Sequence, residues 1–417
     1  MSNQEKKILV IGGGISGMSA ALDASETGYS VILIEKRPSL GGRVSRFHQY
    51  FPKLCPPMCG LEINYKRIRP NKNLQVLTST EALKISGEAP DLKVTLKTSP
   101  TYVNHKCTAC GDCVDVCPSE RPDAFNFGMN KTRAIYLPQQ MAYPNRFVID
   151  RKHCPEGCDK CVVACNYQAI DLNMPAKEQE IDVSSVILAT GWKPYDAKKL
   201  THLGFSKFPN VINNIMMERL ASLSGPTQGV VVRPSDKKPP KSVAFIQCAG
   251  SRDENHLPYC SSICCLASLK QISYVRAQNP EAEIYLFYID IRTPGKYEDF
   301  AARIQEDPKL KLIKGKVAKI TETADGSLVM EAEDILKGNK VHIEVDMAVL
   351  ATGMEPSIAG QSFVGDTIKL DSSGFIQEDQ KAGIFSAGVA KMPLDVSSSV
   401  IDASGAALKA IQNLRSD

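Results

Sequence analysis

The sequence lacks the features of a membrane span or a nucleic-acid surface. No apolar run approaches the roughly 20 residues that a membrane helix needs, so any membrane attachment would depend on another subunit. The formal net charge is only +4 over 417 residues, with 23% charged residues. Such a balance argues against a dedicated nucleic-acid binder, which concentrates Lys and Arg on one face. The six histidines show no H-x3-H or other ligand pairing, so no histidine metal site is predicted.

Targeting segments and repeats are also lacking. The start, residues 1–7, leads straight into a strand pattern, so we expect no secretory signal peptide. Neither Met1-Ser2 nor the final Arg415-Ser416-Asp417 forms a lipidation motif. There is no solenoid repeat and no low-complexity tract. We therefore expect a cytoplasmic protein, in which clustered cysteines are metal ligands or redox thiols rather than disulfides.

What the sequence does have is enough material for several domains and many cysteines. A chain of this length suggests two to four domains, and 43% hydrophobic residues can fill more than one core. Residues 8–11 form an apolar run, residues 15–27 have a helical pattern, and residues 31–34 form a second apolar run. This order predicts the opening βαβ unit of a dinucleotide-binding domain.

A glycine motif lies between the first strand and the helix. Gly12, Gly14 and Gly17 fit G-x-G-x-x-G. Gly12 permits a tight turn, Gly14 lets the backbone approach a pyrophosphate, and Gly17 lets helix and strand pack closely. Glu35 ends the second strand and can accept hydrogen bonds from ribose hydroxyls. A merely structural glycine turn is the alternative, and the strand, helix and acidic residue around the motif argue against it.

The dinucleotide at this motif is FAD or NAD, and three features favour FAD. Residues 40–43 follow the acidic residue at the spacing of two-dinucleotide-binding flavoproteins, and the Ala-Thr-Gly segments 189–191 and 351–353 resemble their crossover motifs. Residues 383–388 resemble the segment that contacts the flavin ribitol, although Val389 stands where Asp is usual. The predicted FAD contacts are Gly12, Gly14, Gly17, Glu35, Lys36, Gly42, Arg43, Ala82, Thr190, Gly191 and Gly388.

Residues 101–175 differ in character, being rich in Cys and Pro. They contain one C-x2-C-x2-C-x3-C-P run and one relaxed copy, the pattern of bacterial ferredoxins, in which the fourth Cys ligates the other cluster. This predicts two 4Fe–4S clusters. Structural zinc is the alternative, but zinc sites favour separated C-x2-C pairs. By the exchange rule one cluster takes Cys107, Cys110, Cys113 and Cys165, and the other takes Cys154, Cys158, Cys161 and Cys117.

Two further cysteine groups lie outside this insert. In a second βαβ-like pattern, Cys248, Cys260, Cys264 and Cys265 stand where a pyridine-nucleotide fingerprint would be. We predict a third iron–sulfur cluster there, and no direct reaction with NAD(P)H. The alternative is four buried small apolar residues. Cys55 and Cys59 follow the Gly41-Gly42 turn and are left open as a dithiol, two ligands of a cluster completed elsewhere, or structural thiols.

Together these motifs resemble the A subunit of heterodisulfide reductase over nearly the whole chain. The resemblance implies an α/β, thioredoxin-reductase-like flavoprotein with two dinucleotide-binding domains and an inserted bacterial-ferredoxin-like module. The expected FAD-binding domain comprises residues 1–100, 176–200 and 346–417, with the insert at 101–175 and a degenerate nucleotide-binding-like domain carrying the cysteine cluster at 201–345.

The resemblance extends to the short members of this family found in quinone-interacting membrane-bound oxidoreductase complexes. It implies an electron-transfer subunit held at the cytoplasmic side of the membrane by a haem-bearing membrane subunit together with a second flavin/iron–sulfur subunit. That complex links menaquinone to adenylylsulfate reductase in dissimilatory sulfate reduction. Three alternatives remain: a soluble electron-bifurcating subunit of the heterodisulfide-reductase type, a stand-alone NAD(P)H oxidoreductase, and a non-catalytic scaffold.

Overall fold

The computed structural model describes residues 6–365 and 367–415. The chain forms two compact units, unit 1 with Met1–Trp192 and Pro356–Asp417, and unit 2 with Lys193–Glu355. The chain passes from one unit to the other along two paired strands, β12 (Trp192–Pro194) and β21 (Met354–Pro356). Each follows an Ala-Thr-Gly segment directly, so the boundaries lie closer to these segments than the expected positions 200 and 345. The terminal residues 1–5 and 416–417, on which the targeting expectations rest, lie outside the described residues.

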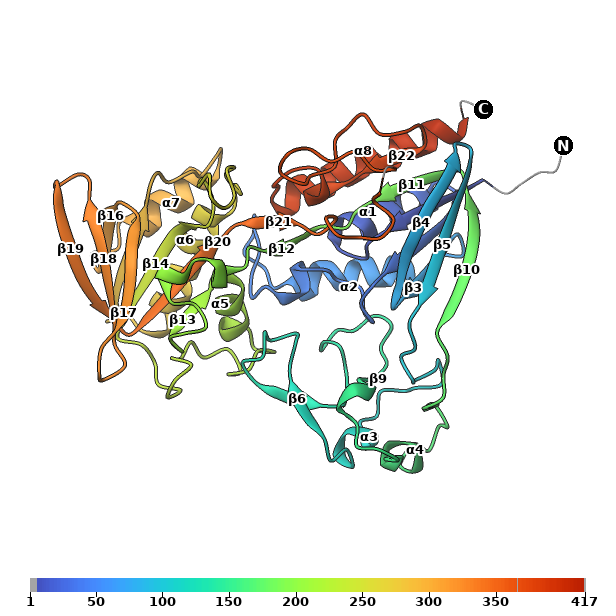
Figure 1. Ribbon diagram of the computed structural model, residues 1–417, viewed down its shortest axis with the longest axis horizontal. Coiled ribbons are helices and arrows are strands. Elements are labelled where there is room, and N and C mark those ends of the chain that lie inside the picture. Colours follow the sequence, from blue (N-terminus) through green and yellow to red (C-terminus); the bar gives the residue numbers. More distant parts are fainter. Residues whose placement is uncertain (1–5, 366, 416–417) are drawn as a thin grey trace. The chain divides into compact units, whose positions relative to one another are not determined.

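Unit 1 is built on a five-stranded parallel sheet that uses both ends of the chain (Figure 1). The strand order is β22-β11-β1-β2-β3. The predicted strands and first helix are present, with bounds that differ by a residue or two. The elements are β1 (Lys7–Ile11), α1 (Ile15–Glu26), β2 (Ser30–Glu35), η1 (Val44–Arg46), α2 (Pro57–Ile68), β3 (Leu74–Thr78), β11 (Ser185–Leu188), β22 (Ile384–Ser386), η5 (Gly388–Ala390) and α8 (Val396–Arg415).

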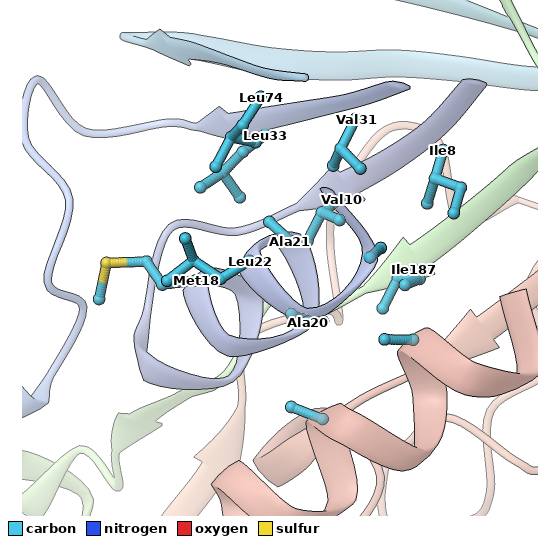
Figure 2. Close-up of a cluster of buried hydrophobic side chains, with 14 of the residues drawn as sticks. Ile8, Val10, Met18, Ala20, Ala21, Leu22, Val31, Leu33, Leu74 and Ile187 are labelled. Carbon is cyan, nitrogen blue, oxygen red and sulfur yellow. The ribbon is translucent and has the colours of Figure 1, made fainter. Parts of the chain in front are cut away.

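Alternate residues of the central strands enter two different cores, which explains their unbroken apolar runs. On one face, Ile8 and Val10 of β1 pack with Val31 of β2 against α1, as Figure 2 shows, and α8 covers the same face. On the other face, Leu9 and Ile11 pack against a second sheet. That antiparallel sheet has the order β10-β5-β4 and consists of β4 (Thr80–Glu88), β5 (Asp91–Thr98) and β10 (Lys177–Val183).

The insert leaves the antiparallel sheet after β5 and returns at β10. Its elements are short, and most of its backbone forms turns. They are α3 (Asp112–Asp115), β6 (Glu120–Pro122), β7 (Lys131–Arg133), β8 (Ile135–Tyr136), β9 (Val148–Ile149), η2 (Arg151–His153) and α4 (Lys160–Val163). Its small core consists of Val103, Ile135, Phe147, Ile149 and Ala169 together with the cysteines themselves.

Unit 2 is a second parallel sheet, in the order β13-β20-β14-β15-β16, beside a three-stranded antiparallel sheet. Its elements are η3 (Ala197–Lys199), η4 (Thr201–Leu203), β13 (Val211–Asn213), α5 (Asn214–Ala221), β14 (Ser242–Ala249), α6 (Cys264–Gln278), β15 (Glu283–Tyr288), α7 (Tyr297–Gln305), β16 (Leu310–Lys314), β17 (Val317–Glu322), β18 (Leu328–Asp334), β19 (Asn339–Val345) and β20 (Met347–Thr352). Across residues 6–365 and 367–415 no helix meets the length and apolarity of a membrane span.

Candidate functional site

Two positions in the loop after β1 must be glycine because of packing within the protein itself. Gly12 has a φ of +114°, which side chains rarely adopt, and a Cβ there would clash with the Ala189 carbonyl. A Cβ on Gly17 would clash with the carbonyl of Gly12. These two glycines let α1 start immediately against the strand ends, as the motif predicts.

Gly14 is different, because nothing in the described protein requires it to be glycine. Its φ is −77°, and a Cβ there would come no closer than 3.7 Å, to Gly42 Cα. Gly42 itself has a φ of +60°, and its Cβ would lie 2.6 Å from Gly14 Cα. The two glycines thus face each other across a backbone cradle. A pyrophosphate that must touch the backbone explains the missing side chain at Gly14, so the cradle fits FAD.

The charges around this cradle also suit a dinucleotide. α1 begins without a side-chain cap or an acidic residue in its first turn, so its N–H groups can face phosphate oxygens. Glu35 is buried and accepts from the Gly13 N–H (2.7 Å) and the Arg37 N–H (2.9 Å). Arg43 donates from Nε to the Trp192 carbonyl (3.0 Å). Burial, then the charge of Arg37, lowers the pKa of Arg43 to about 10, so its guanidinium remains positive at neutral pH.

The segment around Gly388 reaches the same helix start from the other end of the chain. Gly388 has a φ of +64°, and a Cβ there would clash with Ser16 Oγ. Its N–H donates to Asp402 Oδ2 (2.7 Å), and Lys391 Nζ donates to Asp402 Oδ1 (2.8 Å). Asp402 of α8 therefore supplies a carboxylate to this loop where Val389 supplies none. No motif predicts this role, although Asp402 is the one acidic residue of α8.

The other predicted flavin contacts have varied surroundings. Thr190 has a buried Oγ1 with no hydrogen-bond partner among the described residues, as expected of a group that awaits a ligand. Gly191 has a φ of +66° and open space beside it. Lys36 forms an exposed ion pair with Glu81 (2.9 Å), and Ala82 is buried in the core between the two sheets.

Four cysteines from both runs of the insert line one pocket. They are Cys107, Cys110, Cys113 and Cys165, and apolar side chains such as Ile135 complete the lining. Burial, followed by the charges of Cys107 and Cys110, raises the pKa of Cys113 to about 12. Backbone N–H groups lie 3.4 Å from the sulfurs of Cys107 and Cys165. The pocket therefore brings together the set that the exchange rule predicts for one cluster.

The remaining four insert cysteines form a second group. Burial raises the pKa of Cys154, and the charges of Cys117 and Cys158 raise it further. Burial raises the pKa of Cys161, and the charges that Cys154, Cys117 and Cys158 carry when deprotonated raise it further. Cys117 thus stands with the second run although it belongs to the first. Cys161 also acts on Cys113, so the two groups are neighbours.

Each insert group has a guanidinium beside it, which no sequence motif indicates. Burial lowers the pKa of Arg146, and the charge of Cys107 opposes this. Arg151 lowers the pKa of Cys154 through its charge and a hydrogen bond. Arg146 Nε and Arg151 Nη1 are buried and have no hydrogen-bond partner within the described part of the chain. Anionic sulfur ligands beside them would supply acceptors, so the surroundings fit iron–sulfur clusters.

The third cysteine group lies at the carboxyl edge of the parallel sheet of unit 2. Cys248 stands near the end of β14 with a φ of +54°, where the pairing with β20 shifts between Ile246 and Ala249. Cys264 and Cys265 begin α6, which has no side-chain cap. Cys260 lies in the loop before it. A strand bulge, a loop and a helix start therefore bring the four cysteines together at this edge of the sheet.

These four thiols influence one another electrostatically. Burial, then the charge of Cys265, raises the pKa of Cys248 to about 11. Burial, then Cys248, raises the pKa of Cys264 well above its ordinary value. Arg292 lies close enough to Cys260 for a side-chain hydrogen bond. Iron binds cysteine as the thiolate, so these four cysteines would lose their protons on binding an iron–sulfur cluster.

Groups that would hold a single metal ion are not found. In residues 6–365 and 367–415, no three His, Cys, Asp or Glu side chains are close enough to bind one ion. That finding concerns a mononuclear site. In a 4Fe–4S cubane each thiolate binds a different iron, so its four sulfurs stand farther apart than the ligands of one ion.

Cys55 and Cys59 lie apart from the three groups. Cys55 pairs its backbone with Tyr50, and Cys59 is exposed in the first turn of α2. Burial raises the pKa of Tyr50, and the charges of Cys55 and Cys59 raise it further. Both sulfurs therefore lie near one phenol. Their role stays open.

Comparison with known proteins places the chain among flavin and iron–sulfur subunits. Residues 10–65 match the model for an NAD(P)-binding Rossmann-like domain. The chain is 38% identical over 420 residues to the A subunit of H(2):CoB-CoM heterodisulfide,ferredoxin reductase of Methanothermobacter marburgensis, covering 97% of this chain and 63% of that protein. It is 37% identical over 417 residues to the iron-sulfur A subunit of CoB–CoM heterodisulfide reductase of Methanocaldococcus jannaschii, with the same coverage. The chain thus spans less than two thirds of these relatives.

Solved structures show the same fold with little sequence identity. Thioredoxin reductase of T. acidophilum has a TM-score of 0.55 and 13% identity, with 99% of this chain and 100% of that chain covered. Thioredoxin reductase of Lactococcus lactis has a TM-score of 0.52 and 12% identity, with the same coverage. The predicted thioredoxin-reductase-like α/β fold is confirmed.

Proposed function

Because this chain belongs to the family of the heterodisulfide reductase A subunit, we propose that it relays electrons within a complex attached to the cytoplasmic face of the membrane. In this proposal the complex connects the menaquinone pool to adenylylsulfate reductase during dissimilatory sulfate reduction. A haem-bearing membrane subunit together with a second flavin/iron–sulfur subunit holds the chain in place. This finer assignment rests on the motif resemblance; the relay itself is supported by a flavin cradle and two interleaved cysteine groups within one unit.

The chain's own residues would hold the flavin. The Gly14–Gly42 cradle and the start of α1 receive the pyrophosphate, and Arg43 adds a positive charge. The Asp402–Lys391 pair fixes the Gly388 loop. Bound FAD exchanges electrons in pairs or singly, whereas clusters carry one at a time.

The insert is fastened to the flavin-binding part by specific contacts. Gln139 Nε2 donates to the Leu40 carbonyl (2.7 Å). Tyr143 stacks on Tyr65 with ring centroids 5.1 Å apart. The Arg46 guanidinium lies 5.0 Å from the ring centroids of both Phe125 and Phe127. These contacts fix the distance that an electron must cross between the flavin-binding part and the insert, which the protein can control but the cofactors cannot.

The second candidate function is a soluble, electron-bifurcating subunit. The name of the Methanothermobacter marburgensis relative, in which hydrogen, heterodisulfide and ferredoxin occur together, favours it. Both candidates predict non-covalent FAD and about twelve iron atoms per chain, at four for each of three clusters.

Fractionation of the native cell separates the two candidates. The membrane proposal expects release only by detergent, together with a b-type haem protein. Recovery of the whole native pool in the soluble fraction at low salt, with a hydrogenase or dehydrogenase, would refute membrane attachment and support the bifurcating subunit.

A further inference from the structure

Gln247 is a buried amide beside the cysteines of unit 2. It precedes Cys248 in β14, and its side chain is only 4% exposed. The Cys265 thiol donates to Gln247 Oε1 at 3.4 Å. Gln247 Nε2 is also buried and has no hydrogen-bond partner among the residues that the structure describes. A buried amide with unused donors costs stability, so an apolar residue would suit this position better unless the amide had a further partner.

The backbone gives Gln247 its direction. β14 has one more residue than β20 between Ile246 and Ala249, so the ladder shifts register at Gln247 and Cys248. Such a bulge turns side chains away from the regular alternation of the strand, often toward a site. Here the bulge brings the amide of Gln247 and the sulfur of Cys248 to the same edge of the sheet.

The hydrogen bond seen with a protonated thiol cannot persist once Cys265 is a ligand. A ligated sulfur has no proton to donate and can only accept, while the amide oxygen can also only accept. A half-turn about the last side-chain torsion exchanges the oxygen and nitrogen of the amide. Nε2 then faces Cys265 and gains the acceptor that it lacks.

We propose that Gln247 donates an N–H hydrogen bond to the Cys265 thiolate and thereby raises the reduction potential of the third cluster. This deepens the proposed function, because it rests on a cluster being held by the four cysteines of unit 2. Reduction adds one electron and one negative charge to the cluster and its sulfurs. A donor stabilises that added charge, so its removal favours the oxidised form. No proton or covalent bond changes place.

Two variants and one control test the proposal. Gln247→Met keeps an unbranched side chain without donors, and Gln247→His restores a ring N–H. Gln271→Met is the matched control, because Gln271 is equally buried in unit 2 but donates to Asn214 O and Glu218 Oε1 (both 2.8 Å) rather than facing a cysteine. The chain is purified without oxygen and assayed for iron. It is then titrated with dithionite as the electron donor, with the clusters followed by EPR.

We expect Gln247→Met to keep all its iron and to lower the midpoint of one cluster by about 59 mV, a tenfold change for a one-electron couple. Gln247→His should recover part of the shift, and Gln271→Met should show none. An unchanged midpoint in Gln247→Met with twelve irons present overturns the inference alone. Loss of that cluster in both Gln247 variants shows a packing role and also overturns it. A wild-type chain with only eight irons refutes the third cluster itself, and the inference with it.

Discussion

The helices of the insert have four residues each, whereas the cysteines of unit 2 stand on a five-stranded parallel sheet and a helix of fifteen residues. In the insert, the cysteines are themselves part of the small core. In unit 2, Cys264 and Cys265 are also buried, but a separate cluster of twenty buried residues includes none of the four cysteines. We therefore expect the fold of the insert to depend on its metal, and the fold of unit 2 to persist without metal. Similar cysteine ligands would then be the cause of local structure in the insert and its consequence in unit 2.

Removing iron should affect the insert far more than unit 2. Metal binding to a small domain supplies folding free energy on the order of 10 kcal/mol, so the iron-free insert should open while unit 2 stays folded. Tryptic cleavage within residues 101–175 should accelerate by about 100-fold or more, without a matching change within residues 243–290. Mass spectrometry of the fragments measures both rates. Equal acceleration in the two regions would mean that unit 2 also needs its metal to fold.

Substitutions of Gly14 and Gly17 test whether the fold of the protein also shapes the flavin-binding loop. Gly14→Val should leave the chain folded, because a Cβ there would lie at an ordinary van der Waals distance, 3.7 Å, from its nearest neighbour, Gly42 Cα, but should lower the flavin content by at least about tenfold. Gly17→Ala should lose soluble protein, since its Cβ would clash with the Gly12 carbonyl. Absorbance of released FAD and the thermal midpoint measure the two effects. Full flavin retention in folded Gly14→Val would contradict the cradle.

In iron-free protein, the cysteines of unit 2 and of the insert should differ in thiol reactivity. Burial raises the pKa of Cys248 to about 11, so at pH 8 about one molecule in a thousand carries its thiolate, against about a quarter for an ordinary thiol. Alkylation of Cys248 should therefore be about 100-fold slower than that of cysteines in an opened insert. Its rate should rise about tenfold per pH unit up to the folded pKa, because only the thiolate reacts. Peptide mass spectrometry over time measures both; equal rates at pH 8 would contradict the preformed site.

Nicotinamide nucleotides should have no effect on the oxidation state of the flavin. NADH and NADPH should leave the flavin of the isolated chain oxidised, because the strand–helix turn of unit 2 carries cysteines in place of a glycine fingerprint. Stopped-flow absorbance under argon checks this, with dithionite as the positive control. Rapid bleaching of the flavin by either nucleotide would contradict this prediction and show that the chain reacts directly with a nicotinamide nucleotide.

Local patterns predicted much of this architecture. The strand, glycine loop and helix at residues 7–26 follow from periodicity and three glycines. The bacterial ferredoxin pattern predicts that Cys117 and Cys165 change groups, and Cys165 lines the pocket of the first run. Each of these signals lies within a short stretch of sequence, which is why it can be read without a structure.

The rest depended on contacts between distant segments. Asp402 acts on Gly388 through the packing of α8, and Gln247 acquires its direction from a one-residue bulge. Neither has a periodic signature. Arg146 lies far from Cys107 in sequence, and only the fold of the insert brings its charge there. The compact units change at residues 192/193 and 355/356 rather than at the expected positions 200 and 345, because the crossing strands follow the Ala-Thr-Gly segments at once.

The distribution of the ligands along the chain bears on the order of assembly during synthesis. All eight insert cysteines lie within residues 107–165, so the ribosome has released a complete set long before it reaches Gly388. The flavin-binding part instead includes the loop at Gly388, which contacts Ser16 at the start of α1, and β22, which completes the sheet. We therefore expect that iron–sulfur delivery can begin on the growing chain, whereas FAD must wait until β22 and the loop at Gly388 have been made. A cell starved of riboflavin should accumulate a chain that holds iron but no flavin.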